Sequence, residues 1–268
     1  MYQAFFDMEY DPFSQRAVDK TEPFASQDFT QATARLEHLK QLQGIGLFSG
    51  HPGSGKTLVV RKWATALNPG LFKVVYQPMN SVTTMEFYRG LCYGLGLEAK
   101  FKKIDMFNDL QQHLMLLAKD KRIVPVIILD EAQYLRTDIL NDLKLILNFE
   151  MDSKAYVILI LMGLPVLGTL LARKTHEALA QRIVMNYTFQ GLSRSETAAY
   201  LENRLKACGV RQPIFHDNAI EAIVAAANGS VRLLNAIASK ALLLAAHQKK
   251  QQISADLILN VRDDMALV

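Results

Sequence analysis

The feature that most constrains this chain is the segment 50–57, Gly-His-Pro-Gly-Ser-Gly-Lys-Thr, which fits the pattern G-x-x-x-x-G-K-[ST]. It lies between a short apolar run at 46–49 and a stretch with helical spacing at 56–67. In this strand–loop–helix context the glycines let backbone N–H groups approach phosphate oxygens, and the helix presents its positive end to them. A glycine turn without function is the alternative, and the flanking pattern disfavours it. We therefore predict a nucleotide phosphate site formed by Gly50, Pro52, Gly53, Ser54, Gly55, Lys56 and Thr57.

Two of these side chains have expected roles. Lys56 should reach the β- and γ-phosphates, and the Thr57 hydroxyl should bind Mg²⁺. Further along the chain, Asp130 and Glu131 follow the continuous apolar run 124–129, where an α/β sheet places its ligand groups. Asp130 suits the Mg²⁺ site, and Glu131 is placed to polarise an attacking water. The alternative is that the two acids cap the next helix. Together the two motifs predict a nucleoside triphosphatase that uses ATP and Mg²⁺.

The hydrophobic pattern of the chain predicts two different architectures, one after the other along the chain. Up to about residue 189, short β-branched runs alternate with helical stretches, which indicates a parallel sheet covered on both faces. From Leu192 onward only helical patterns remain, beginning with a Ser-x-x-Glu capping box at Ser193. We expect an N-terminal segment at 1–34, an α/β nucleotide-binding domain at 35–191 and a helical domain at 192–268. Within the first segment, the apolar residues near the N-terminus should pack on the sheet or on a neighbouring subunit.

Composition excludes several classes of protein. With 268 residues, 50% hydrophobic and 21% charged, the chain is neither fibrous nor disordered, and it is long enough to bury a core without disulfides. Its two cysteines, Cys92 and Cys208, lie far apart and are expected to be reduced thiols. The acidic N-terminus is unlike a signal peptide, and no apolar run approaches the roughly 18 residues of a membrane span. These features predict a cytoplasmic protein with no membrane partner.

Charge is unevenly distributed along the chain. The net charge of +4 combines −4 over residues 1–29 with +8 over the remainder. A basic body permits a polyanionic partner without requiring one.

Several short motifs resemble one family. The DEAQ run at 130–133, Gly-Leu-Pro at 163–165, Asp-Pro-Phe at 11–13 and GSVRLLN at 229–235 resemble the ExeA-type branch of the AAA+ class. That branch includes bacterial transposition ATPases of the TniB/TnsC kind. The resemblance implies a P-loop NTPase fold, with a parallel sheet flanked by helices and followed by an all-helical AAA+ lid. It also implies a homo-oligomer, either a ring or a helical filament, and a segment at 23–29 that borders the adenine.

The resemblance assigns roles to two arginines. Arg232 matches the sensor-2 arginine, which contacts the γ-phosphate from the lid, and Arg182 matches the arginine-finger region, with Arg173 as the second candidate. A finger acts on a neighbouring subunit's nucleotide and supplies charge as the transition state forms. The polar sensor-1 side chain of many relatives is missing here, because the chain reads Met162-Gly163-Leu164 at that point. We therefore expect slow hydrolysis, or hydrolysis that depends on DNA or a partner.

The resemblance also suggests where DNA would bind. In related assemblies the region around residue 100 faces a central channel, and lysines there would neutralise phosphates without reading sequence. The candidates are Arg89, Lys100, Lys102 and Lys103. An ordinary solvated charged loop is an equally good interpretation.

The function that we predict from these observations is transposition regulation by an ATP-dependent assembly. Such an assembly forms on double-stranded DNA, largely independently of sequence, and recruits or activates a transposase. One alternative is an ExeA-like secretion or envelope-assembly ATPase, and another is an ATP-gated scaffold that binds only protein. The ExeA pattern continues past the lid into a membrane span and a peptidoglycan-binding module, whereas this sequence stops at Val268, so we expect the first function.

Overall fold

The computed structural model describes residues 2–79, 83–149 and 155–265, and the chain divides into two compact units. The sheet unit comprises residues 31–50 and 56–189, and the helical unit comprises residues 1–30, 51–55 and 190–268. The phosphate-binding motif therefore contributes to both units: Gly50, Lys56 and Thr57 belong to the sheet unit, and residues 51–55 to the helical unit.

Five parallel strands form the sheet, which confirms the predicted α/β class. They are β1 (Gly44–Gly50), β2 (Phe72–Pro78), β3 (Val124–Asp130), β4 (Ile158–Gly163) and β5 (Ile183–Phe189), in the spatial order β2-β3-β4-β1-β5. Because all pairs are parallel, the carboxyl ends of the strands meet at one edge. Gly50, Asp130 and Gly163 consequently end three adjacent strands, β1, β3 and β4, at that edge.

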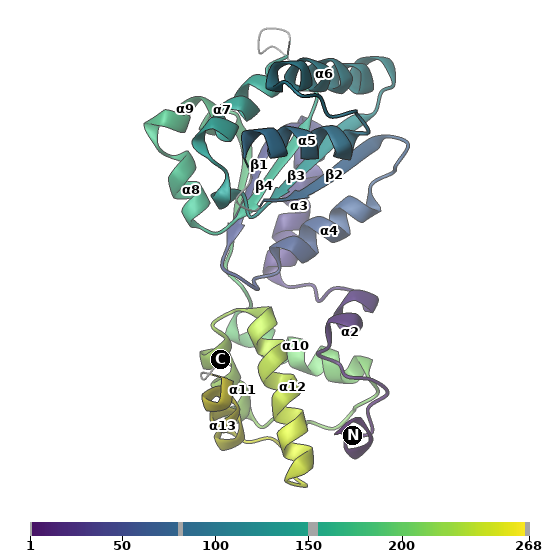
Figure 1. Cartoon of the computed structure of the whole chain (residues 1–268). Coiled ribbons are helices and arrows are strands. Elements are labelled where there is room, and N and C mark those ends of the chain that lie inside the picture. The colour runs from purple at the N-terminus through teal and green to yellow at the C-terminus, as the bar shows by residue number, and fades with distance from the viewer. Residues whose placement is uncertain (1, 80–82, 150–154, 266–268) are drawn as a thin grey trace. The chain divides into compact units, whose positions relative to one another are not determined.

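Alternation along the strands divides the core of the sheet unit into two layers. Ile45, Leu47, Ile127 and Leu159 point into one cluster with the helices that follow β2, β3 and β4. Figure 1 shows these helices on one face of the sheet and α3 and α4 on the other. The bounds of this unit's helices are α3 (Gln27–Leu42, which starts in the helical unit), α4 (Lys56–Ala66), α5 (Thr84–Leu95), α6 (Lys103–Met115), α7 (Thr137–Ile146), α8 (Val166–Leu171) and α9 (Glu177–Ala180).

Local sequence signals explain where several helices begin and end. Thr83 and Glu86 form a capping box at the start of α5, and Gly96, with a φ of 82°, ends that helix in the left-handed conformation. The described residues of this unit also form a π turn η1 (Leu116–Asp120) and the 3₁₀ turns η2 (Ala132–Tyr134) and η4 (Lys174–His176).

The helical unit has its own core. It contains α1 (Tyr2–Phe5), α2 (Gln15–Lys20), α10 (Arg194–Ala207), α11 (Asp217–Ala227), α12 (Val231–His247) and α13 (Ala255–Met265). The predicted capping box of Ser193 and Glu196 is present at α10. Phe6, Met8 and Phe13 lie in one buried cluster with residues of α10 to α13. The N-terminal segment thus packs on the lid helices, whereas its sequence had suggested the sheet or a neighbouring subunit.

Three properties of the described residues bear on the class of protein. No helix among them is long and apolar enough to cross a membrane. Both cysteines are buried and free. No cluster of three or more histidine, cysteine or acidic side chains is arranged among the described residues to hold a metal ion.

Candidate functional site

The phosphate-binding loop leaves the carboxyl end of β1 and leads into α4. Gly53 and Gly55 have φ angles of 78° and 97°, a left-handed backbone conformation that residues with a Cβ rarely adopt. A Cβ built on Gly55 meets no atom within 4 Å, so the loop has open space at that point. The buried Ser54 hydroxyl has no hydrogen-bond partner within the described residues. An open glycine loop with an unsatisfied hydroxyl fits the phosphate group of a nucleotide.

Lys56 and Thr57 occupy the first turn of α4, as the motif predicts. The Lys56 side chain is only 8% exposed, and its Nζ donates to the Gly50 carbonyl oxygen at 2.7 Å. A buried ammonium favours a negatively charged ligand, because charge removed from water must be compensated. This places the cation beside the loop that the sequence assigns to phosphates.

Asp130, at the carboxyl end of β3, lies beside Thr57. The Thr57 hydroxyl donates to Asp130 Oδ2 at 3.2 Å across 73 positions of sequence, and Asp130 as a residue is 6% exposed. A threonine hydroxyl and a carboxylate oxygen are hard ligands of the type that Mg²⁺ prefers. The structure therefore brings together the two residues that the sequence predicts for magnesium.

Tyr76 is a third residue at this carboxylate, and the sequence motifs did not indicate it. Its hydroxyl donates to Asp130 Oδ2 at 2.9 Å from the neighbouring strand β2. Burial, followed by this hydrogen bond, raises the pKa of Tyr76 to about 12, so the hydroxyl is protonated and donates at neutral pH. The signal that could have revealed it is its position two residues before the end of β2, at the same edge as Asp130.

Glu131 begins the turn after β3 with a φ of 57°, in the left-handed region. Its side chain is exposed, and its Oε2 accepts a hydrogen bond from Gln133 Nε2 at 2.7 Å. The Gln133 Oε1 accepts in turn from the Leu164 N–H at 3.0 Å, just beyond β4. At the end of β4, where many relatives carry the polar sensor-1 side chain, this chain has Met162, which is 1% exposed. A polar side chain that does reach the end of this strand is that of Gln133, which comes from the turn after β3.

In the helical unit, the loop segment 51–55 contacts the start of α12. The Val231 N–H donates to the Gly53 carbonyl oxygen at 2.9 Å, and the Ser230 hydroxyl donates to the Pro52 carbonyl oxygen at 3.2 Å. A Cβ on Gly53 would lie 2.3 Å from Ser230 Oγ and 2.9 Å from Arg232 Cβ. Arg232, the sensor-2 candidate, is exposed and immediately adjoins the phosphate-binding loop.

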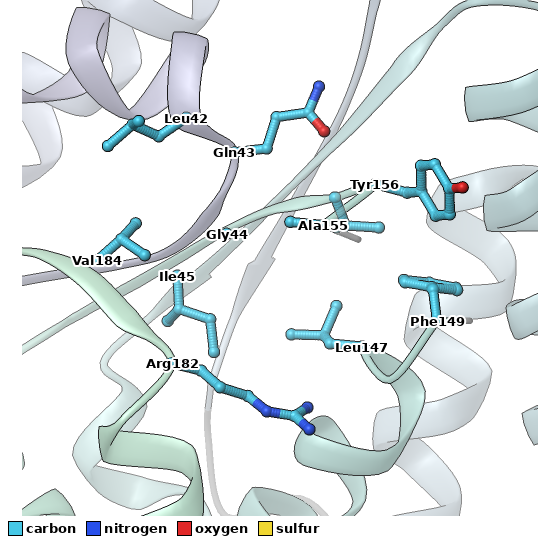
Figure 2. A pocket seen from close by; sticks show the side chains of 11 residues that line it. Leu42, Gln43, Gly44, Ile45, Leu147, Phe149, Ala155, Tyr156, Arg182 and Val184 are labelled. Carbon is cyan, nitrogen blue, oxygen red and sulfur yellow. The ribbon is translucent and has the colours of Figure 1, made fainter. Parts of the chain in front are cut away.

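The two candidates for the arginine finger differ in their surroundings. Arg182 is half-buried and donates from Nη1 to the Lys144 carbonyl oxygen at 2.7 Å. It lines a pocket of about 300 Å³ together with Ile45 and Leu147 (Figure 2). This pocket lies at the amino ends of β1, β4 and β5, the edge of the sheet opposite Gly50 and Asp130. Arg173 is exposed at the start of η4.

The DNA candidates are exposed, but two of the lysines are paired with acids. Lys100 lies 2.6 Å from Asp109, and Lys103 lies 2.6 Å from Asp142. Hydrogen bonding to Asp109 raises the pKa of Lys100. Lys102 forms no ion pair with any residue that the structure describes, and it adjoins Phe101, which is 89% exposed. Arg89 is exposed on α5.

Comparison with known proteins shows which family the chain resembles. Residues 39–171 match the family model described as "AAA domain". Over 251 residues the chain is 33% identical to the general secretion pathway protein A of Aeromonas hydrophila. The chain is an ExeA-like AAA+ protein. The match covers 91% of this chain and 45% of that relative, so the chain spans about half of the relative's length.

Several solved structures have a fold similar to that of this ExeA-like chain. A chain of the Drosophila origin recognition complex bound to DNA gives a TM-score of 0.73 at 19% identity, covering 99% of this chain and 66% of that one. The Aeropyrum pernix ORC1 protein in complex with DNA gives a TM-score of 0.66 at 18% identity, covering 95% of this chain and 68% of that one. The Thermotoga maritima RuvB branch migration motor gives a TM-score of 0.55 at 14% identity, covering 94% of this chain and 72% of that one. At these identities the likeness concerns the fold, which is the predicted P-loop NTPase sheet with a helical C-terminal region.

Proposed function

We propose that this AAA+ protein hydrolyses Mg-ATP at the loop after β1 and transmits the state of the nucleotide to its lid helices. The observation that carries the proposal is the meeting of Thr57 and Asp130, with the buried Lys56 beside the same loop. Bound Mg²⁺, held by Thr57 and Asp130, would neutralise charge on the β- and γ-phosphate oxygens. Lys56 and the loop N–H groups would bind the phosphates, and Glu131 would polarise the attacking water.

Coupling to the lid follows from the contacts of the loop itself. Residues 51–55 hydrogen-bond to the first residues of α12, which carries Arg232. A change in the loop on loss of the γ-phosphate would therefore act directly on α12. Arg232 would report on the γ-phosphate from the lid side, as the family resemblance implies.

We further propose that the protein works as a homo-oligomer, with an arginine finger supplied by a neighbouring subunit. Arg182 and Arg173 are both candidates. Arg173 is exposed, whereas Arg182 would have to leave the Lys144 carbonyl to reach a neighbour. This supports Arg173 as a candidate of equal standing.

We propose that the ATP-bound assembly forms on duplex DNA in the cytoplasm. There it recruits or activates a transposase. Support comes from the net +8 outside residues 1–29 and from two fold relatives whose structures were solved with DNA. Lys102 and Arg89 are exposed and suited to phosphate contacts. Lys100 could join them, because its pair with Asp109 is exposed and such pairs are worth only about 0–1 kcal/mol, whereas Lys103 would have to leave the buried Asp142.

The second candidate is a role in secretion or envelope assembly. A specific observation favours it: the 33% identity to general secretion pathway protein A extends over nearly the whole chain. In that case the partner of the ATP-bound state would be a protein, and DNA would have no effect on turnover. A scaffold that binds only protein would behave in the same way.

One experiment separates these outputs. The binding of a random-sequence duplex is measured with ATP at several salt concentrations, and ATP turnover is measured with and without the duplex. We expect ATP-dependent binding that weakens steeply with salt, together with stimulated turnover. The K100A/K102A/K103A variant should bind DNA weakly, and each lost phosphate contact should reduce the log–log salt slope by about 0.9.

Single variants sharpen that test. K102A should weaken DNA binding more than K100A, because Lys100 is partly neutralised by Asp109. Absence of ATP-dependent DNA binding in the parent would rule out the transposition role and favour the secretion or scaffold role. Binding with an unchanged salt slope in the triple variant would move the DNA site elsewhere on the protein.

A further inference from the structure

Gln133 lies between the residue that we assign as the catalytic base and the end of a neighbouring strand. Its Nε2 donates to Glu131 Oε2 at 2.7 Å, and its Oε1 accepts from the Leu164 N–H at 3.0 Å. One amide side chain thus connects the turn after β3 to the residue that follows β4.

The orientation of this amide is determined by its partners. The oxygen and nitrogen of a glutamine are assigned from its hydrogen bonds, and here the assignment is unambiguous in chemical terms. A backbone N–H can only donate, so Oε1 must face Leu164. An ionised carboxylate can only accept, so Nε2 must face Glu131. Reversing the amide would place two donors together and two acceptors together.

Gly163 provides the space for this arrangement. A Cβ built on Gly163 would lie 2.4 Å from Gln133 Oε1, closer than real Cβ atoms approach an oxygen. Gly163 has no positive φ, so the backbone conformation does not explain the glycine. The close approach of the Gln133 amide does.

We propose that Gln133 is a positioning residue for hydrolysis, taking the place of the polar side chain that β4 lacks. Met162 is buried and apolar, so β4 itself presents no polar side chain where relatives orient the attacking water. Gln133 instead holds the Glu131 carboxylate through a charge-assisted hydrogen bond and anchors it to the β4 end. This inference rests on the proposed ATP hydrolysis and deepens it.

The test uses two variants of Gln133 in the full chain. Gln133→Leu removes both hydrogen bonds. Gln133→Glu keeps an acceptor for the Leu164 N–H but replaces the donor with an oxygen facing Glu131. We expect both to lower kcat for ATP by about tenfold or more, while KM for ATP changes by less than about twofold. A role limited to anchoring Leu164 would leave Gln133→Glu at the parental kcat.

A matched control is Gln111→Leu, because the Gln111 amide also hydrogen-bonds to the backbone, donating to the Leu145 carbonyl oxygen at 2.9 Å, but lies on α6 outside the site. It should keep the parental kcat and KM. The measurement is steady-state phosphate release over a range of ATP concentrations, with thermal unfolding of every variant in parallel.

The outcomes separate the two proposals. If the parent hydrolyses ATP and both Gln133 variants keep or exceed its kcat, the positioning role is wrong and the proposed function stands. If kcat and KM change together with a loss of folded protein in both variants, Gln133 is structural and the inference is also wrong. If the parent and the Gln111 control show no hydrolysis with or without DNA, the proposed function fails, and this inference fails with it.

Discussion

At the scale of single residues, the site is organised around the Asp130 carboxylate. Its Oδ2 accepts hydrogen bonds from Thr57 and Tyr76, and its Oδ1 accepts from the Glu131 N–H at 2.9 Å. These contacts hold the carboxylate in one orientation without neutralising it, which suits a group that binds a cation directly or through water. Tyr76 contributes from β2, which carries none of the recognised motifs.

Tyr76→Phe tests that contribution. The variant loses only the hydroxyl that orients Asp130, and loss of such supporting hydrogen bonds typically lowers metal affinity by about tenfold or more. We expect half-maximal ATP turnover to require about tenfold more Mg²⁺, with maximal turnover at saturating Mg²⁺ close to the parental rate. Tyr93→Phe, a change at an exposed position of α5, serves as the control. An unchanged Mg²⁺ requirement in Tyr76→Phe would show that Thr57 and the Glu131 N–H suffice to orient Asp130.

Sequence motifs anticipated one contact at this scale and missed two others. The pairing of Thr57 with Asp130 follows from two recognised patterns, although 73 positions separate the residues. The roles of Tyr76 and Gln133 depend on which strand ends lie side by side. Sheet order decides that, and local periodicity carries no information about it.

At the scale of elements, the start of α12 combines two tasks. The Ser230 hydroxyl caps the helix by accepting from the Leu233 N–H at 3.4 Å, and it donates to the Pro52 carbonyl oxygen of the phosphate-binding loop. Gly53 lacks a Cβ at the point where that atom would collide with Ser230 and Arg232. The helix start and the loop therefore fit each other closely, which is what coupling between nucleotide and lid requires.

Ser230→Ala separates this from ordinary helix capping. Loss of a cap costs about 1 kcal/mol, and the lost hydrogen bond to the loop should weaken ATP binding by roughly two- to tenfold. Thr83→Ala removes a comparable cap from α5, which belongs to the sheet unit. We expect thermal unfolding temperatures to fall in both variants, and ATP affinity, measured by titration with a fluorescent analogue, to fall only in Ser230→Ala. Equal ATP affinity in the two variants would argue against coupling through Ser230.

Element boundaries were largely predictable where capping residues mark them. The Ser-x-x-Glu box at Ser193 predicts the start of a helix, and α10 begins at Arg194 with that capping box formed. The sequence carries no comparable signal that α6 ends at Met115 and continues as the π turn η1. That change depends on hydrogen bonding to the chain entering β3, including the bond from the Ile123 N–H to the Leu117 carbonyl, which helical periodicity does not encode.

At the scale of the whole molecule, the sequence predicts a parallel α/β sheet and a helical C-terminal region, and both are present. The N-terminal segment was harder to place, because aromatic residues such as Phe6 and Phe13 can bury themselves against any apolar surface. In the structure they complete the core of the helical unit. Similarly, a run of lysines at 100–103 predicts a positive surface, yet Asp109 and Asp142 neutralise part of it after folding.

The central claim is that this chain hydrolyses Mg-ATP with Glu131 as the residue that polarises water. The most direct test measures ATP binding and ATP turnover on the same preparations of the parent, Glu131→Gln and Lys56→Ala. We expect Glu131→Gln to bind Mg-ATP with the parental affinity and to lose turnover by about a hundredfold or more. Lys56→Ala should lose nucleotide binding itself, because its buried ammonium lies beside the phosphate-binding loop. Parental turnover in Glu131→Gln, or parental ATP affinity in Lys56→Ala, would contradict the account.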